Sequence, residues 1–410
     1  MNYCEPYQSC SLFGALRYFS NIANCACLIN GPTGCTFFNN SAMIRLNGYF
    51  NAPSKVEIPK IFCTAFNETD AILGCEEKVE LAGEEIIQQM HPEVLFIFNC
   101  CVSEIVGTDI DTIAETLSDK YQIPVIPVHT AGFKGDHKYG MRMACDVLME
   151  HFFLSQTEKR ERSVNLLGEF DYFNRSTVEL QTMLHKIGIT DIHNIPGKCT
   201  LTALYDAPNA ALNIITCQNA SRYLAEQMND KFSIPYAGEG SQFYGMENCA
   251  VLYKKIYNFF GESTEPIDQF VEETKQKLQP LLEELRGRTA FVIASTRRSL
   301  GYASILKELG IEVQLIFSEG DEKYVNKSSF LKYSNNVMLN EYPYELRAKI
   351  EENQPDFIFS TIPELVAPYK YLIRPEVDYA GIEGVYRMAV YLLSILEASG
   401  KTTAAIRIEN

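Results

Sequence analysis

The residues most able to do chemistry in this sequence are cysteines at the ends of expected helices and strands. Cys100 and Cys101 directly follow the apolar run Val94–Phe98, which is the pattern of a strand buried on both faces. Cys35 follows a glycine-proline turn, and Cys10 precedes a helical stretch. Each of these thiols is either a ligand or simple packing, because free cysteine is among the most buried residue types.

Three of the thiols, Cys10, Cys35 and Cys101, are expected to lie close together, because element ends at one edge of an α/β sheet converge in space. Soft thiolates are the usual ligands of iron–sulfur clusters. Three cysteines are one fewer than the four that usually bind an iron–sulfur cluster. A cluster at a subunit interface, completed by the partner chain, would resolve this.

The bulk composition limits the classes of function. The chain has 410 residues, 46% of them hydrophobic and 21% charged, which is globular composition sufficient for two or three domains. A net charge of −16 without a compact basic run argues against nucleic acid and anionic membranes as partners. No apolar run is long enough to span a bilayer, and the N-terminus has no signal-peptide pattern. A cytoplasmic protein is therefore expected.

Cysteine usage points to ligation rather than to disulfides. The thirteen cysteines are an odd number in a large chain, so a disulfide framework is not expected. The sequence contains no GxGxxG, no phosphate loop, no HExxH, no GxSxG and no paired CxxC. Dinucleotide binding, direct ATP use and a zinc ribbon therefore receive no support from motifs.

The periodicities predict an α/β protein of three consecutive doubly wound domains, each with a mainly parallel sheet flanked by helices. We expect an N-terminal domain over 1–160 with the clustered cysteines, a middle domain over 161–285 with Cys217, and a C-terminal domain over 286–410. Cys217 ends the strand Leu212–Cys217 and precedes a helix. Other expected elements include the helix Glu76–Met90 and a strand over Cys199–Tyr205.

At its cysteines the sequence resembles component 1 of nitrogenase and its relatives. The family pattern is a cysteine before a helix, a Gly-Pro-x-Gly-Cys turn, and a cysteine six residues before Gly-x-Asp. The matching residues, with cysteines 25 and 66 positions apart, are Cys10, Gly31-Pro32-Thr33-Gly34-Cys35, and Cys101 with Gly107-Thr108-Asp109. Because Gly107 fixes the register, the resemblance assigns the ligand to Cys101 and makes Cys100 its neighbour.

The resemblance extends along the chain. Several segments are similar to the E-type subunit, the scaffold on which the nitrogenase cofactor matures: 126–135, 140–145, 164–169 and 241–245. Asn213–Cys217 is similar to the α-type segment whose cysteine binds the large active-site cluster. Met141 stands where dinitrogen-reducing α subunits have a catalytic histidine, and Pro375 where they have a cofactor-ligating one. The absence of histidine after His193 argues against an ordinary dinitrogen-reducing α subunit.

The family resemblance implies a nitrogenase-like oxidoreductase. Electrons would pass through an interface cluster of 4Fe-4S or 8Fe-7S type at Cys10, Cys35 and Cys101 to a second complex iron–sulfur cofactor at Cys217. The expected substrate is a small molecule other than dinitrogen, for example a methylthio compound. Alternatives are a scaffold subunit for maturation of a nitrogenase-type cofactor, a tetrapyrrole reductase, and a non-catalytic electron-transfer or structural subunit whose partner chain holds the active site. The alternative for Cys217 itself is a buried packing thiol.

The implied partners are proteins. A homologous component 1 subunit, of β or N type or identical to this chain, would form a dimer or tetramer with it. A separate ATP-dependent iron protein would dock and deliver one electron at a time. The lack of a phosphate loop in this chain fits that role, because the iron protein uses the ATP.

Overall fold

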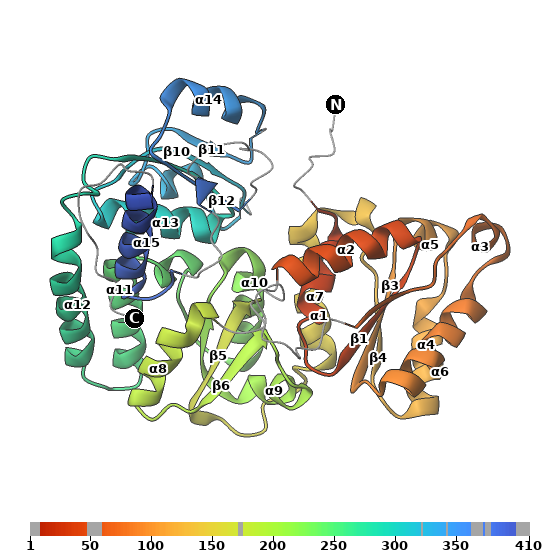
Figure 1. The fold of residues 1–410 in the computed structure, drawn as a ribbon. Helices are drawn as coiled ribbons and strands as arrows, with labels where there is room; N and C mark the ends of the chain where they lie inside the picture. The colour runs from red at the N-terminus through yellow and green to blue at the C-terminus, as the bar shows by residue number, and fades with distance from the viewer. Residues whose placement is uncertain are drawn as a thin grey trace. The chain divides into compact units, whose positions relative to one another are not determined.

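The computed structural model describes residues 9–46, 60–170, 175–320, 323–341, 343–361, 372–373 and 379–398. These residues form three sheets that follow one another along the chain, with helices around them (Figure 1). All strand pairs with a defined register are parallel. The predicted α/β class with three parallel sheets is confirmed. Among the described residues, no helix combines the length and apolarity needed to cross a membrane.

The N-terminal sheet has the strand order β2-β1-β3-β4. Its strands are β1 (Cys25–Asn30), β2 (Ile61–Cys63), β3 (Val94–Asn99) and β4 (Val125–Val128). Every residue of β1 and β3 is buried, as the apolar runs predict. The helices of this part are α1 (Ser11–Phe19), α2 (Thr33–Leu46), α3 (Glu68–Leu73), α4 (Glu76–Met90), α5 (Cys101–Val106), α6 (Ile110–Tyr121) and α7 (His137–His151).

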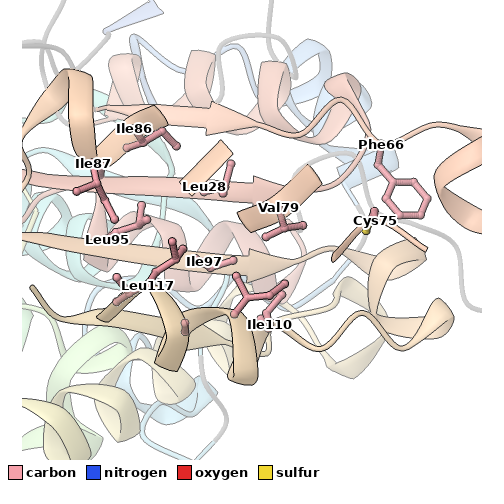
Figure 2. Packing of buried hydrophobic residues seen from close by; sticks show 14 residues of the cluster. Leu28, Phe66, Cys75, Val79, Ile86, Ile87, Leu95, Ile97, Ile110 and Leu117 are labelled. Atoms are coloured by element: carbon pink, nitrogen blue, oxygen red, sulfur yellow. The ribbon is translucent and has the colours of Figure 1, made fainter. Parts of the chain in front are cut away.

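A continuous hydrophobic core lies between this sheet and helices α4 and α6. Figure 2 shows the buried side chains of both helices meeting the strand residues Leu28, Leu95 and Ile97. The helix Glu76–Met90 has the predicted bounds, and its apolar residues recur with helical spacing on the buried face. This core fixes the strands whose carboxyl ends carry the candidate site.

Helices α1 and α7 pack closely on the other side of the N-terminal sheet (Figure 1). Two glycines allow the close approach: a Cβ at Gly14 would collide with the carbonyl of His137, and one at Gly140 with the carbonyl of Ser11. The contact brings the residue before α1, which is Cys10, beside the turn before α7. The 3₁₀ turn Gly132–Lys134 lies in that segment.

The middle sheet has the strand order β6-β5-β7-β8. Its strands are β5 (Arg160–Glu169), β6 (Asp191–Pro196), β7 (Ala210–Ile215) and β8 (Tyr236–Ala237), and its helices are α8 (Val178–Lys186), α9 (Leu201–Asp206) and α10 (Gln218–Phe232). The strand expected over Cys199–Tyr205 is wrong, because this segment forms helix α9. Thr200 caps that helix by accepting a hydrogen bond from the backbone N–H of Ala203.

The C-terminal sheet has the strand order β11-β10-β9-β12-β13. Its strands are β9 (Thr289–Ile293), β10 (Glu312–Ser318), β11 (Val337–Leu339), β12 (Phe357–Ser360) and β13 (Leu372–Ile373). The helices are α11 (Met246–Phe259), α12 (Glu265–Leu278), α13 (Thr296–Glu308), α14 (Leu346–Asn353) and α15 (Gly384–Ala398).

Internal contacts divide the chain into two compact units. The first unit comprises residues 1–174, 191–214 and 220–236, and the second comprises 175–190, 215–219 and 237–410. The three-domain boundaries near residues 160 and 285 stay a prediction. Cys10, Cys35 and Cys101 belong to the first unit, and Cys217 belongs to the second.

Candidate functional site

Backbone hydrogen bonds hold Cys10 against the segment before α7. The Ser11 N–H donates to the carbonyl of Gly135 at 3.0 Å, and Cys10 and Asp136 form an antiparallel bridge. The Ser11 hydroxyl donates to the carbonyls of Thr130 and Ala131, at 2.9 and 2.7 Å. The position of Cys10 is therefore fixed by α1 and by the turn that contains Gly132.

Cys10 and Cys101 converge on Gly132. A Cβ built on Gly132 would lie 3.0 Å from Cys10 Cβ and 3.1 Å from Cys101 Sγ, so a larger residue there would require these two side chains to shift by a few tenths of an ångström. The Gly132 N–H donates to Cys101 Sγ over 3.2 Å. Backbone N–H donors to thiolate sulfur tune the potentials of iron–sulfur clusters.

Cys35 interacts with both of these thiols and also with Cys100. Its Sγ is in hydrogen-bonding contact with Cys100, and it is close enough to Cys10 and Cys101 for their charges to affect it. That contact lowers the pKa of Cys100 to about 5 and, together with burial, raises the pKa of Cys35. One thiolate therefore forms readily in this group of four cysteines.

A buried polar network fixes the strand ends that carry these thiols. Asn30 at the end of β1 donates to Asn99 at the end of β3 over 3.1 Å, and Asn99 donates to the carbonyl of Thr108 over 3.0 Å. The Ser103 hydroxyl on α5 donates to the carbonyl of Asn30 at 2.6 Å. Buried and satisfied hydrogen bonds of this kind hold side chains in one arrangement.

The donor set fits an iron–sulfur cluster. It consists of thiols around a glycine turn, with a backbone N–H donor to sulfur, and none of the cysteines in the described ranges forms a disulfide. Within those ranges, no three Cys, His, Asp or Glu side chains converge tightly enough to bind a single metal ion. The ligand assignment of Cys10, Cys35 and Cys101 stays a prediction.

Exposed apolar side chains lie on helices α2 and α5, which contain Cys35 and Cys101, and on α3 and the turn beside Gly132. Phe37 on α2 is 77% exposed, and Ile105 on α5 is 73% exposed. Phe38, Ile72, Leu73, Val102, Val106 and Phe133 are also exposed, on α2, α3, α5 and the turn beside Gly132. We call these eight residues the apolar rim. Exposed apolar side chains that form a contiguous patch are typical of a protein-binding surface.

Cys217 lies in the second unit, between the end of β7 and the start of α10. It is half-buried. The glycine loop before α11 packs against it: a Cβ on Gly240 would lie 2.8 Å from the carbonyl oxygen of Thr216 and 3.2 Å from Cys217 Cα. The same Cβ would lie 3.4 Å from Cγ of Arg297, in the first turn of α13.

Arg297 gives the surroundings of Cys217 a positive charge. Its guanidinium lies over the rings of Phe243 and Tyr244, with centroid distances of 5.8 and 5.6 Å. A thiol, a close backbone turn and a guanidinium together suit a bound anion. The sequence prediction included Cys217 but missed Arg297. The signal was the Arg297-Arg298 pair directly after a buried strand, at the edge where such sheets bind ligands.

The loop beside Cys217 is tied to the C-terminal sheet through Glu308 on α13. Its carboxylate accepts hydrogen bonds from the N–H groups of Met246 and Glu247, at 2.8 and 3.2 Å, which lie at the start of α11. Burial raises the pKa of Glu308 to about 7, although these two hydrogen bonds oppose the shift. Glu308 therefore caps the helix that follows the glycine loop.

A parallel α/β fold whose clustered cysteines lie at strand ends defines a class of cluster-binding redox proteins. The model of the nitrogenase component 1 type oxidoreductase family matches residues 10–381, and this chain belongs to that family. The nitrogenase iron-molybdenum cofactor biosynthesis protein NifE of Clostridium pasteurianum is 28% identical over 372 residues, covering 88% of this chain and 80% of that protein. The nitrogenase molybdenum-iron protein alpha chain of Methanothermococcus thermolithotrophicus is 25% identical over 382 residues, covering 88% and 78%.

A solved structure has the same fold. The chain described as nitrogenase Cp1 at pH 5 superimposes with a TM-score of 0.79 and 21% sequence identity, covering 98% of this chain and 92% of that one. Family membership and fold therefore confirm the resemblance inferred from the cysteine spacing. They leave the ligands and the reaction of this chain as proposals.

Proposed function

We propose that this chain is a scaffold subunit on which a nitrogenase-type iron–sulfur cofactor is held and matured. The observation that carries the proposal is the similarity to NifE of Clostridium pasteurianum, a cofactor biosynthesis protein, at 28% identity over 88% of this chain. The comparison thus favours the scaffold alternative over the reductase that the sequence alone suggested. Catalytic turnover is not required by this proposal.

A cofactor that is held only until it is transferred to another protein must be bound by ligands that can release it. Cys217 is the one cysteine of the site, and no histidine follows His193 in the sequence, so no imidazole from the C-terminal half can act as a second ligand. Pro375, the counterpart of the family's cofactor-ligating histidine, lies outside the described residues. A single thiolate, with Arg297 balancing part of the negative charge, suits reversible attachment.

The first unit adds a second argument against dinitrogen reduction. Met141 on α7 is only 4% exposed, and its thioether has no proton to donate. The resemblance gives this position to a histidine that assists catalysis in dinitrogen-reducing α subunits. A scaffold does not need that proton donor.

The cluster proposed at Cys10, Cys35 and Cys101 would supply electrons during maturation. When bound, such a cluster transfers one electron at a time at low potential. The residues of this chain would hold it: Gly132 donates its N–H to Cys101, and the apolar rim would meet a homologous component 1 subunit. An ATP-dependent iron protein is the proposed electron donor.

A nitrogenase-like reductase of a small substrate other than dinitrogen, such as a methylthio compound, is the second candidate. The similarity to the α chain and the guanidinium of Arg297, which lies over Phe243 and Tyr244 of the loop that packs against Cys217, favour it, because both also suit a cofactor that stays bound. A tetrapyrrole reductase would bind its macrocycle without Cys217. The scaffold and the reductase proposals differ in the fate of the cofactor: a scaffold passes it to another protein, and a reductase keeps it bound.

Transfer of the cofactor tests the proposal. The chain is purified anaerobically after growth on radioactive iron and incubated with a cofactor-free component 1 protein. We expect radioactive iron to move to the acceptor and restore its activity. Cys217→Ala should abolish the transfer, and Cys249→Ala, which removes a buried thiol of α11, should not. Retention of the iron together with steady turnover of a small substrate would instead support the reductase.

A further inference from the structure

Cys100 is the thiol of this group of four cysteines that the resemblance leaves without a role. It is 2% exposed, whereas Cys10 and Cys101 are exposed and Cys35 is half-buried. Its Sγ contacts Cys35, which in turn interacts with Cys10 and Cys101. The four sulfurs therefore form one group, with two thiols at the surface, Cys35 between, and Cys100 at the base.

The sulfur of Cys100 lies against Gly31, in space that a side chain at that position would fill. A Cβ at Gly31 would lie 2.8 Å from Cys100 Sγ, so a larger residue there would displace the thiol. The Ser103 hydroxyl lies 3.7 Å from the same sulfur and can donate to it. The backbone N–H of Cys100 is bonded to the carbonyl of Asn30 at 3.1 Å, which fixes the residue at the end of β3.

We propose that Cys100 is a fourth cysteine ligand of the iron–sulfur cluster, so that one chain carries a complete four-thiolate set. This inference rests on the proposed cluster at Cys10, Cys35 and Cys101. A cluster with iron at four corners takes one thiolate at each. The partner subunit then shields the cluster through the apolar rim and contributes no ligand.

Ligation by Cys100 replaces its S–H bond with an iron–sulfur bond and releases the proton to solvent, as for any cysteine ligand. The contact between Cys35 and Cys100 opens when both sulfurs bind iron. An eight-iron cluster shared between two chains would draw three cysteines from each and would not need Cys100. The two arrangements therefore predict different effects of removing this thiol.

The first test measures iron and acid-labile sulfide in the Cys217→Ala chain, so that only the first site contributes. We expect about four iron atoms per chain. Adding Cys100→Ser should at least halve the iron and change the electron paramagnetic resonance spectrum of the reduced protein. Adding Cys63→Ser is the matched control and should change neither. Cys63 lies at the same sheet edge, where its Sγ donates to the carbonyl of Gly31 and accepts from the N–H of Ala65.

Unchanged iron and spectrum with Cys100→Ser would overturn the proposal. A variant with Cys101→Ser distinguishes an error about Cys100 from an error about the whole cluster. If this variant keeps all its iron, both the ligand role of Cys100 and the cluster at Cys10, Cys35 and Cys101 are wrong. Transfer of cofactor from Cys217 is measured independently of either result.

A second test leaves Cys100 in place. Ile105→Glu puts a charge in the apolar rim and should give a monomer by size-exclusion chromatography. If the partner contributes no ligand, the monomer keeps the iron and the spectrum of the unmodified assembly. Loss of the cluster on dissociation would overturn the proposal even if the Cys100 variant fails to fold.

Discussion

Replacing Glu308 with glutamine should remove a pH-dependent loss of stability from the second unit. Glu308 is buried and accepts the N–H groups of Met246 and Glu247, so its protonated form is favoured in the folded protein. Glutamine has the same shape and cannot ionise. Because Met246 and Glu247 donate to different oxygens of Glu308, the single amide oxygen of glutamine keeps only one of the two acceptors, and the cost of losing the other does not change with pH. The substitution therefore isolates the cost of the buried charge.

The size of the effect follows from the pKa of Glu308. Its pKa is about 7 in the folded chain against an ordinary value of 4.5. Because the folded state holds the proton more tightly, the contribution is fully present below pH 4.5 and is lost as pH rises to 7. At roughly 1.4 kcal/mol per pH unit, the loss is about 3 kcal/mol in the limit of full burial.

The assay is urea denaturation of wild type and Glu308→Gln from pH 4.5 to 8. Other groups titrate in both proteins, so the difference between the two free energies of unfolding reports Glu308 alone. We expect that difference to move in favour of Glu308→Gln by about 1–3 kcal/mol as pH rises, and to level off above pH 7. A difference that stays constant with pH would refute the reasoning.

Three further predictions concern the first unit. Gly132→Ala should reduce the iron bound at the cysteine group, because its Cβ would crowd Cys10 and Cys101, whereas Gly34→Ala, whose Cβ meets nothing within 4 Å, should not. Equal iron in both would contradict this. Leu95→Ala should cost about 2–5 kcal/mol of unfolding free energy by denaturation, against little for the exposed Leu81→Ala. Asn67→Ala removes the capping box of α3 and should cost about 1 kcal/mol; an unchanged melting curve would contradict it.

Strong periodicity made most of the fold predictable. The run Val94–Phe98 and the helix Glu76–Met90 carry patterns that tertiary context reinforces, because both lie in one hydrophobic core. The segment after Cys199 was expected to be a strand from its apolar residues, but it forms a short helix that begins after the cap at Thr200. Strand β6 (Asp191–Pro196) was not predicted, since its sequence mixes polar residues with a proline.

The candidate sites were predictable only where sequence spacing carries information. The spacing of Cys10, Cys35 and Cys101 pointed to a common group of thiols. The structure places Cys10 and Cys101 beside Gly132, with Cys35 interacting with both of them and with Cys100. The contact of Cys100 with Cys35 depends on how the glycine turn packs against the end of β3. Arg297 reaches the neighbourhood of Cys217 through tertiary packing, which no local pattern encodes.

The account's central claim is that Cys217 anchors a complex cofactor separate from the cluster of the first unit. Iron and acid-labile sulfide per chain, measured on anaerobically purified wild type and Cys217→Ala, test it most directly. The account predicts more iron in wild type than the first cluster can hold, with the excess lost in Cys217→Ala. Equal iron in the two proteins would contradict the claim and would leave Cys217 as a packing residue.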